Sequence, residues 1–298
     1  MIYFQGTTDF YMAGPTAVTL GKFDGVHAGH QKLLRHIQSR RSCHEQSVAF
    51  VLNARNDSLL MTEEEQRRFL EQLGIDCMVR CPFIPEISGM SPSVFIDEVL
   101  LKRLHARSVT VGTDFRFGYK RAGDAAFLKS YGKAHGIEVT IMDKEMYQGR
   151  EISSTYVREA LSRGDMELAA QLLNRPYSVC GTVIHGRALG RRLGMPTANL
   201  IPEGSKLLPP DGVYFSRTVF RPGEETIPGI TNIGYKPTVG GNFRGVETYL
   251  FDTDRDLYGE QAEVSLLHFK RKEKKYDSVA ALKQQIDTDI STGREYFG

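Results

Sequence analysis

A glycine-rich turn between an apolar run and a helical pattern constrains this chain more than any other feature. Residues 19–30 read Thr-Leu-Gly-Lys-Phe-Asp-Gly-Val-His-Ala-Gly-His and begin inside the apolar run 17–20. The three glycines permit close approaches that a side chain would block, and the N-terminus of the next helix directs N–H groups at an anion. His27 and His30 add two donors on one side of the chain. The pattern predicts a phosphate-binding turn, and a plain turn with two surface histidines is the alternative.

The H-x-G-H spacing in this turn resembles the signature of the adenylyltransferase superfamily, in which it holds the phosphates of ATP. The longer form, G-K-F-D-G-V-H-A-G-H, resembles the N-terminal half of the prokaryotic bifunctional riboflavin kinase/FAD synthetase family. The resemblance implies that the turn contacts ATP through Gly21, Phe23, Asp24, Gly25, His27, Gly29 and His30.

Length and charge bound the possibilities. The 298 residues suggest about two domains. A net charge of +2 gives no broad field for nucleic acid or membrane. Four cysteines without C-x-x-C spacing indicate thiols in a reducing compartment, and no secretory or membrane-spanning run is found, so we expect a cytoplasmic protein. Residues 1–6 contain Tyr-Phe-Gln-Gly, which resembles a protease-site remnant, and are left out of the fold prediction.

The first half alternates strand and helix patterns. A capping box at Thr62–Glu65 and a Ser91-Pro92 start each open a helix. Alternation of this kind predicts a Rossmann-like domain with a parallel sheet, covered on both faces, whose ligands bind at the carboxyl ends of the strands. The expected strands are 17–20, 47–52, 77–81, 108–111 and 138–142, and the other expected helices are 30–41, 125–135 and a hairpin over 162–173.

Two later segments fall at the same predicted edge. Val-Gly-Thr-Asp-Phe-Arg-Phe-Gly (111–118) follows the fourth strand, and Ile-Ser-Ser-Thr-Tyr-Val-Arg (152–158) opens a helix after the fifth. Taken singly, the first is also compatible with a plain loop and the second with an ordinary capped helix. The family resemblance implies that the first contacts the nucleotide and the second the phosphates, through Asp114, Phe115, Ser153, Ser154, Thr155 and Arg158.

Near residues 174–177 the pattern changes from helical to short alternating strands, which predicts a domain boundary between residues 176 and 177. Strands of this kind close best into a small antiparallel barrel, with a helix over 278–290 that plugs or flanks it. The predicted domains are therefore 1–176 and 177–298. The expected strands are 177–185, 212–220, 225–233, 246–251 and 262–269, with a further one ending the loop after residue 185.

The run 181–199 is rich in glycine and arginine, and it is not a Walker loop because the chain contains no G-x-x-x-x-G-K-[ST]. A solvated basic turn is one interpretation. Thr197 and Asn199 lie two residues apart, so an extended chain places their oxygens on one face, which suits Mg²⁺. The run resembles the riboflavin kinase signature, whose P-T-A-N segment binds Mg-ATP. The resemblance implies an ATP and flavin site formed by Gly181, His185, Gly186, Gly190, Arg191, Gly194, Pro196, Asn232, Arg271 and Glu273.

The two implied reactions need different groups. A ribityl hydroxyl is a weak nucleophile, so its phosphorylation calls for a base, and Glu247 is the candidate, with a solvent-facing strand carboxylate as the alternative. Adenylylation of FMN starts from an anionic phosphate and needs donors rather than a base, which His27 and His30 supply. Relatives often carry T-F-x-P-H-P where this chain has Phe50-Val-Leu-Asn-Ala-Arg-Asn56, and histidine where it has Tyr249.

We therefore predict a bifunctional enzyme that makes FMN from riboflavin and ATP in the C-terminal barrel and FAD from FMN and ATP in the N-terminal domain. The expected ligands are riboflavin, FMN, FAD, ATP and Mg²⁺, with no nucleic acid or membrane partner and self-association left open. The alternatives are a riboflavin kinase with an altered or regulatory N-terminal domain, a flavin-binding module without turnover, and nucleotidyl transfer to another phosphate compound.

Overall fold

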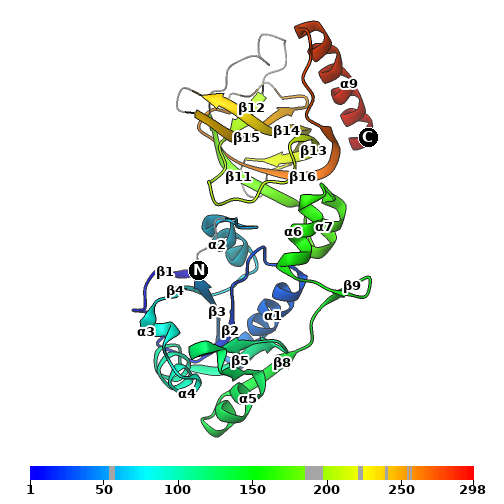
Figure 1. Cartoon of the computed structure of the whole chain (residues 1–298). Coiled ribbons are helices and arrows are strands. Elements are labelled where there is room, and N and C mark those ends of the chain that lie inside the picture. The colour runs from blue at the N-terminus through cyan, green and yellow to red at the C-terminus, as the bar shows by residue number, and fades with distance from the viewer. Residues whose placement is uncertain (54–57, 185–196, 221–223, 239–240, 254, 256) are drawn as a thin grey trace. The chain divides into compact units, whose positions relative to one another are not determined.

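The computed structural model describes residues 1–53, 58–184, 197–220, 224–238, 241–253, 255 and 257–298, with side chains left undescribed at 53, 236–238 and 241–243. The chain forms two compact units (Figure 1). The first comprises Met1–Asn56 and Met61–Ser154, and the second comprises Asp57–Leu60 and Thr155–Gly298. Each unit is described by itself.

The first unit is built on a parallel sheet of six strands within the described residues, in the order β1-β4-β3-β2-β5-β8. The predicted parallel α/β domain is confirmed. Successive residues of β3 face opposite sides of the sheet, and both sides are buried, as expected for a parallel sheet covered by helices. The strands are β1 Ile2–Gln5, β2 Thr16–Gly21, β3 Gln46–Asn53, β4 Cys77–Pro82, β5 Ala106–Gly112 and β8 Glu138–Met142.

The two helices of this unit with predicted caps begin where the sequence places them, whereas α1 begins at Ala28, two residues before its predicted start. The Thr62 hydroxyl accepts from the Glu65 N–H while the Glu65 carboxylate accepts from the Thr62 N–H, which completes the capping box. Ser91 caps the helix that starts with Pro92. The helices are α1 Ala28–Ser39, η1 Arg40–Cys43, α2 Glu63–Gln72, α3 Pro85–Ser88, α4 Pro92–Phe95, the π-helix η2 Ile96–Arg103, η3 Tyr119–Arg121 and α5 Ala125–Ala134. Two short hairpins are β6 Arg116–Phe117 with β7 Gly123–Asp124, and β9 Met146–Tyr147 with β10 Arg150–Glu151.

The exclusion of residues 1–6 from the fold was wrong. Residues Ile2–Gln5 form β1, which pairs in parallel with β4 from Ile2↔Cys77 to Gln5↔Arg80. The Met1 amino group lies 3.2 Å from a carboxylate oxygen of Glu71 on α2. The resemblance to a protease site concealed an edge strand with apolar Tyr3 and Phe4, so the sheet has one strand more than the five expected.

The second unit begins with two helices, α6 Ser154–Ser162 and α7 Met166–Leu173, separated by Gly164 at φ +72°. The predicted break at Gly164 is confirmed, but the hairpin begins at Ser154 and not at residue 162 as predicted. Six antiparallel strands then close into a barrel in the order β11-β12-β15-β14-β13-β16, as the sequence predicts. Their bounds are β11 Tyr177–Ile184, β12 Thr197–Leu200, β13 Gly212–Val219, β14 Ile227–Thr238, β15 Gly241–Leu250 and β16 Gln261–Lys272.

Strands β14 and β15 are longer than predicted. Their ladder continues past Ile233↔Val246 to Tyr235↔Arg244 and beyond. Gly234 and Pro237 lower the strand propensity of this stretch, and for that reason the sequence places the strand ends too early.

Helix α9 Val279–Phe297 flanks the barrel and does not plug it (Figure 1). Ile290 and Phe297 pack on a cluster of Val213, Phe215, Ile230 and Phe251. Val279, an apolar residue in the first turn of this helix, is 61% exposed. The second half of α9 therefore carries most of its packing.

A short segment from the first half of the sequence belongs to the second unit. Leu59 forms a parallel bridge with Lys206, its N–H donates to the Ser205 carbonyl at 2.6 Å, and its carbonyl accepts from the Leu207 N–H at 2.8 Å. The Lys206 ammonium donates to the Leu60 carbonyl at 2.9 Å. These bonds make residues 58–60 an added strand-like edge of this unit.

Candidate active sites

The glycine-rich turn lies between β2 and α1, at the carboxyl edge of the first-unit sheet. Gly21 ends β2 and His27 is the N-cap of α1. Gly25 adopts φ +79°, and the non-glycine residues Phe23 and Val26 adopt φ +51° and +40°. Left-handed conformations of this kind cost free energy and persist where surrounding contacts enforce them. The turn therefore lies where the sequence predicts, although two of its three left-handed residues are not glycines.

The two histidines of the turn stack on each other. Their ring centroids lie 3.7 Å apart, and the edge of Phe23 packs 5.1 Å from the His30 ring. A Cβ at residue 29 would come within 3.3 Å of the His27 ring, so Gly29 makes room for this stack. The His30 Nδ1 is buried without a hydrogen-bond partner among the described residues. A polar ring atom in this state suits a ligand oxygen.

Burial, together with the neighbouring His27 ring, holds the pKa of His30 well below its usual value. The ring is therefore neutral at pH 7 and offers one N–H donor to a phosphate. A bound polyphosphate would raise this pKa because the anion stabilises the protonated ring.

Asp114 and Ser154, one from each of the two later motifs, belong to the first unit. The Ser154 hydroxyl donates to the carbonyl of Asp24 at 2.8 Å, so its proton orients the turn. Asp114 follows β5, and its carboxylate lies 3.0 Å from the Lys144 ammonium, which also lies 2.7 Å from Glu151. Phe115 stacks on Phe117. Lys144 was not a sequence candidate, because a lysine in a polar loop has no distinguishing pattern.

Ser153 is half-buried just before α6. Thr155 and Arg158 belong to the second unit, where an Arg158 Nη donates to the Ser58 carbonyl at 2.6 Å. Their part in phosphate binding stays a prediction.

In the barrel, four predicted residues share one face. Asn199 on β12 pairs with Glu247 on β15, which in turn pairs with Asn232 on β14. Paired residues of an antiparallel ladder point to the same side, so these three side chains are neighbours. The Thr197 hydroxyl donates to Glu247 Oε1 at 2.8 Å. The geometry thus gathers one carboxylate, two amides and a hydroxyl from segments about 50 residues apart.

The opposite side of the same strands is lined by hydroxyl groups that the sequence did not single out. Thr231 bonds to Thr248 at 2.8 Å and to Ser216 at 2.7 Å, and all three are fully buried. Each hydroxyl satisfies the next, which removes most of the cost of burying them.

The C-terminal candidates divide into two groups. The Asn232 amide donates to Glu273 Oε1 at 3.2 Å, and a Cβ at Gly234 would lie 2.3 Å from that oxygen, so the glycine makes room for the carboxylate. Arg271, by contrast, makes a two-pronged ion pair with the buried Asp289 of α9, with its closest contact at 2.7 Å. This pair anchors α9, and a role of Arg271 in ligand binding stays a prediction.

A Cβ at Gly181 on β11 would lie 3.2 Å from the Ile201 carbonyl, so this glycine permits a close approach of two chain segments. The remaining kinase candidates lie outside the described residues: His185, Gly186, Gly190, Arg191, Gly194 and Pro196.

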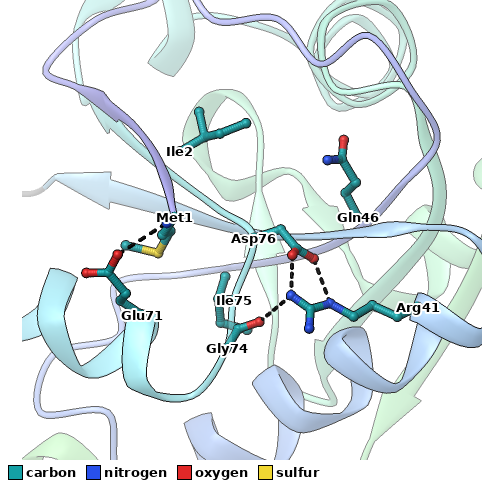
Figure 2. A pocket seen from close by; sticks show the side chains of 8 residues that line it. All are labelled: Met1, Ile2, Arg41, Gln46, Glu71, Gly74, Ile75 and Asp76. Carbon is teal, nitrogen blue, oxygen red and sulfur yellow. Dashed lines mark hydrogen bonds and ion pairs between the residues drawn. The ribbon is translucent and has the colours of Figure 1, made fainter.

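A cavity of about 580 Å³ lies at the amino ends of the first-unit strands, away from the candidate residues (Figure 2). Arg41 crosses it, with Nε 3.1 Å from Asp76 and an Nη 2.9 Å from the Gly74 carbonyl. Ligands of parallel sheets bind at the carboxyl ends of the strands, so this cavity does not compete with the turn as an active site.

Among the described residues no group of three or more His, Cys, Asp or Glu side chains could hold a metal ion. The side-chain oxygens of Thr197 and Asn199 form a different donor set, of hard neutral oxygens, which fits an Mg²⁺ that also binds nucleotide phosphates. In the part of the chain that the structure describes, no helix has both the length and the apolar character needed to cross a membrane.

The first unit is a parallel α/β unit with H-x-G-H at its first long strand-to-helix turn, and the second is a six-stranded barrel with Thr-Ala-Asn on a strand. This combination is typical of a two-part nucleotide-dependent transferase. Family models agree: residues 11–156 match FAD synthetase and residues 173–297 match riboflavin kinase. Proteins named bifunctional riboflavin kinase/FMN adenylyltransferase are 35% identical in Haemophilus influenzae, over 94% of both chains, and 36% identical in Escherichia coli, over 94% of this chain and 92% of that one.

The chain therefore belongs to the bifunctional riboflavin kinase/FMN adenylyltransferase family. A solved structure described as a macrolide-efflux protein from Streptococcus pneumoniae is 28% identical, covers 98% of both chains and has a TM-score of 0.85. It shares the fold over nearly the full length.

Proposed function

We propose that the chain phosphorylates riboflavin to FMN in residues 177–298 and adenylylates FMN to FAD in residues 1–176. The matches to the FAD synthetase and riboflavin kinase models, which end at 156 and begin at 173, support this division. Together with the names of the bifunctional relatives, they disfavour the alternative of a riboflavin kinase with an altered or regulatory nucleotide-binding N-terminal domain. The observation that carries the kinase assignment is the clustering of Glu247 with Thr197, Asn199 and Asn232 on one barrel face.

For the kinase, Glu247 takes the proton of the ribityl hydroxyl as that oxygen bonds to the γ-phosphorus of ATP and the bond to ADP breaks. The hydrogen bond from Thr197 holds the carboxylate in place. Thr197 and Asn199 would hold Mg²⁺, which when bound neutralises phosphate charge. Asn232 positions Glu273, which we assign to the flavin side of the site.

For adenylyl transfer, a phosphate oxygen of FMN bonds to the α-phosphorus of ATP, and the bond to the β-phosphate bridging oxygen breaks to release pyrophosphate. The attacking oxygen is already anionic, so no base is needed. His27 and His30 donate hydrogen bonds to the polyphosphate, and the helix N-terminus behind them adds a positive dipole. Arg158 and Thr155 complete the donor set in this proposal. We also propose a cytoplasmic location for the protein.

The test uses two variants of the intact protein. His27→Ala with His30→Ala should stop FAD formation while FMN still accumulates from riboflavin, ATP and Mg²⁺. Glu247→Gln should lower riboflavin phosphorylation at least about 100-fold and still convert supplied FMN to FAD. Chromatographic separation of riboflavin, FMN and FAD measures both.

His135→Ala, at an exposed histidine, and Glu263→Gln, on β16, are matched controls that should keep both activities. The assignment fails if either site variant loses both activities while folded, or if the wild-type chain forms no FAD.

A further inference from the structure

A buried glutamine on α2 contacts the glycine-rich turn of residues 19–30. Gln66 is 4% exposed, and its Nε2 donates to the Phe23 carbonyl at 2.8 Å and to the Lys22 carbonyl at 3.2 Å. A buried amide without partners would destabilise the fold, so these two bonds account for a polar residue on the inward side of the helix.

The orientation of this amide is fixed by a charged neighbour. Gln66 Oε1 accepts from an Arg80 Nη at 2.9 Å, and Arg80 is 8% exposed on β4. A guanidinium only donates, so the amide oxygen must face Arg80 and the NH₂ group must face the turn. Arg80 is held in turn, with Nε 3.0 Å from Glu63, whose carboxylate also accepts from the Tyr3 hydroxyl.

These bonds set the direction of the peptide groups in the turn. A trans peptide is planar with its C=O and N–H pointing in opposite directions. Because the carbonyls of Lys22 and Phe23 point at Gln66, the N–H groups of Phe23 and Asp24 point away from α2. The turn contains positive φ angles at Phe23 and Val26, so its conformation depends on such external contacts.

Two further side chains act in the same way on the rest of the turn. Ser154 donates to the Asp24 carbonyl at 2.8 Å, and Gln31 donates to the Val26 carbonyl at 2.9 Å. Side chains from outside the turn thus hold four of its carbonyls. Of these three residues only Ser154 belongs to a motif that the sequence analysis used, and Gln66 alone holds two of the four carbonyls.

We propose that Gln66 is a positioning residue for adenylyl transfer. It orients the two peptide groups that follow Lys22 and Phe23, so that the N–H groups of Phe23 and Asp24 point to the ATP polyphosphate. This inference rests on the proposed function of the turn. It assigns to α2 and β4 a part in nucleotide affinity without any contact to the nucleotide.

The decisive variant is Gln66→Glu in the full-length protein. A carboxylate keeps the volume and the bond from Arg80 but has no donor for the two carbonyls and repels them. We expect the KM for ATP in FMN adenylylation to rise at least about tenfold, as two lost hydrogen bonds imply, with a smaller change in kcat. Riboflavin phosphorylation by the same molecules should stay within about twofold and serves as a control for the amount of protein and for the folding of the second unit, while circular dichroism and the largely retained kcat of adenylylation report on the first unit.

Gln66→Met, which removes the donors without adding charge, should raise the KM for ATP in the same direction. Gln72→Glu makes the same chemical change at the exposed end of α2 and should leave the KM unchanged. Equal losses of both activities, an unchanged KM for ATP, or an equal effect of Gln72→Glu would overturn the inference. If the wild-type chain forms no FAD, or His27→Ala with His30→Ala leaves FAD formation intact, the proposed function of the turn fails instead.

Discussion

The ion pair between Arg271 and Asp289 gives the sharpest quantitative prediction. The Asp289 side chain is 2% exposed and that of Arg271 is 23% exposed. Three contacts of 2.7–3.1 Å join them, and Gln285 donates to the same carboxylate at 3.1 Å. Asp289→Asn keeps the shape but removes the charge and leaves an NH₂ group facing the guanidinium.

Removing one partner of a fully buried pair costs about 3–5 kcal/mol, and a hydrogen bond to a charged group contributes about 1.5–3 kcal/mol. Because Arg271 is 23% exposed and solvent screens the lost charge, we expect a loss below that of a fully buried pair, about 2 kcal/mol, which is comparable to one hydrogen bond to a charged group. For a unit of this size the loss corresponds to a fall in Tm of about 4–8 °C.

The assay is urea denaturation of Asp289→Asn, Arg271→Met and the double variant, followed by intrinsic tyrosine fluorescence and circular dichroism. The two single losses should couple, so that the double variant loses less than their sum. Asp287→Asn, at an exposed position of the same helix, is the control. A loss for Asp289→Asn below about 0.5 kcal/mol, equal to that of the control, would refute the anchoring role.

Two further predictions concern the two sites. The pKa of His30 is lower in the folded chain than in the unfolded one, so the unfolded chain binds one more proton at low pH. The free energy of unfolding should therefore fall as the pH drops below about 6.5, by at most about 1.4 kcal/mol per pH unit. His30→Gln should reduce this dependence between pH 5 and 7 in urea titrations, and the rest should come from His36, whose pKa is also lowered by burial. A wild-type slope equal to that of the variant would contradict the prediction. Gly234→Ala should push the flexible Glu273 carboxylate aside, raising the KM for riboflavin while changing the free energy of unfolding by less than about 1 kcal/mol. Gly229→Ala, whose Cβ would lie 2.3 Å from a backbone carbonyl, should be the more destabilising of the two, and the reverse order would be inconsistent with this geometry.

The architecture was predictable because local patterns carry it. Alternating strand and helix signals predict the parallel unit, and turn-punctuated short strands predict the barrel. The spacing of Thr197 and Asn199 places both on one strand face, as the structure has them. What the sequence does not contain is the register that sets Glu247 beside Asn199, because pairing across about 50 residues depends on the whole ladder.

The remaining differences have physical causes. Gln66 was missed because the inward face of α2 was assigned to its apolar residues, and a buried amide leaves no periodic signal. The apolar pattern of α9 predicts contacts along its length, whereas the residues that it buries are Asp289 and Gly293, which hold it by charge and close approach. Residues 1–6 were left out because they contain a protease-site motif. No local pattern argued against this, since their pairing partner β4 lies more than 70 residues away in the sequence.

The bridge between Leu59 and Lys206 bears on how the two halves of this enzyme evolve. Residues 57–60 belong to the second unit, although the residues before and after them in the sequence belong to the first. No single cut in the sequence therefore separates the two units. If the kinase half were exchanged between relatives, the Ser205 carbonyl and the Leu207 N–H would have to form their hydrogen bonds with a segment from another protein. We therefore expect substitutions around residues 58–60 to be correlated with substitutions around residues 205–207. A stable recombinant should take both segments from the same parent.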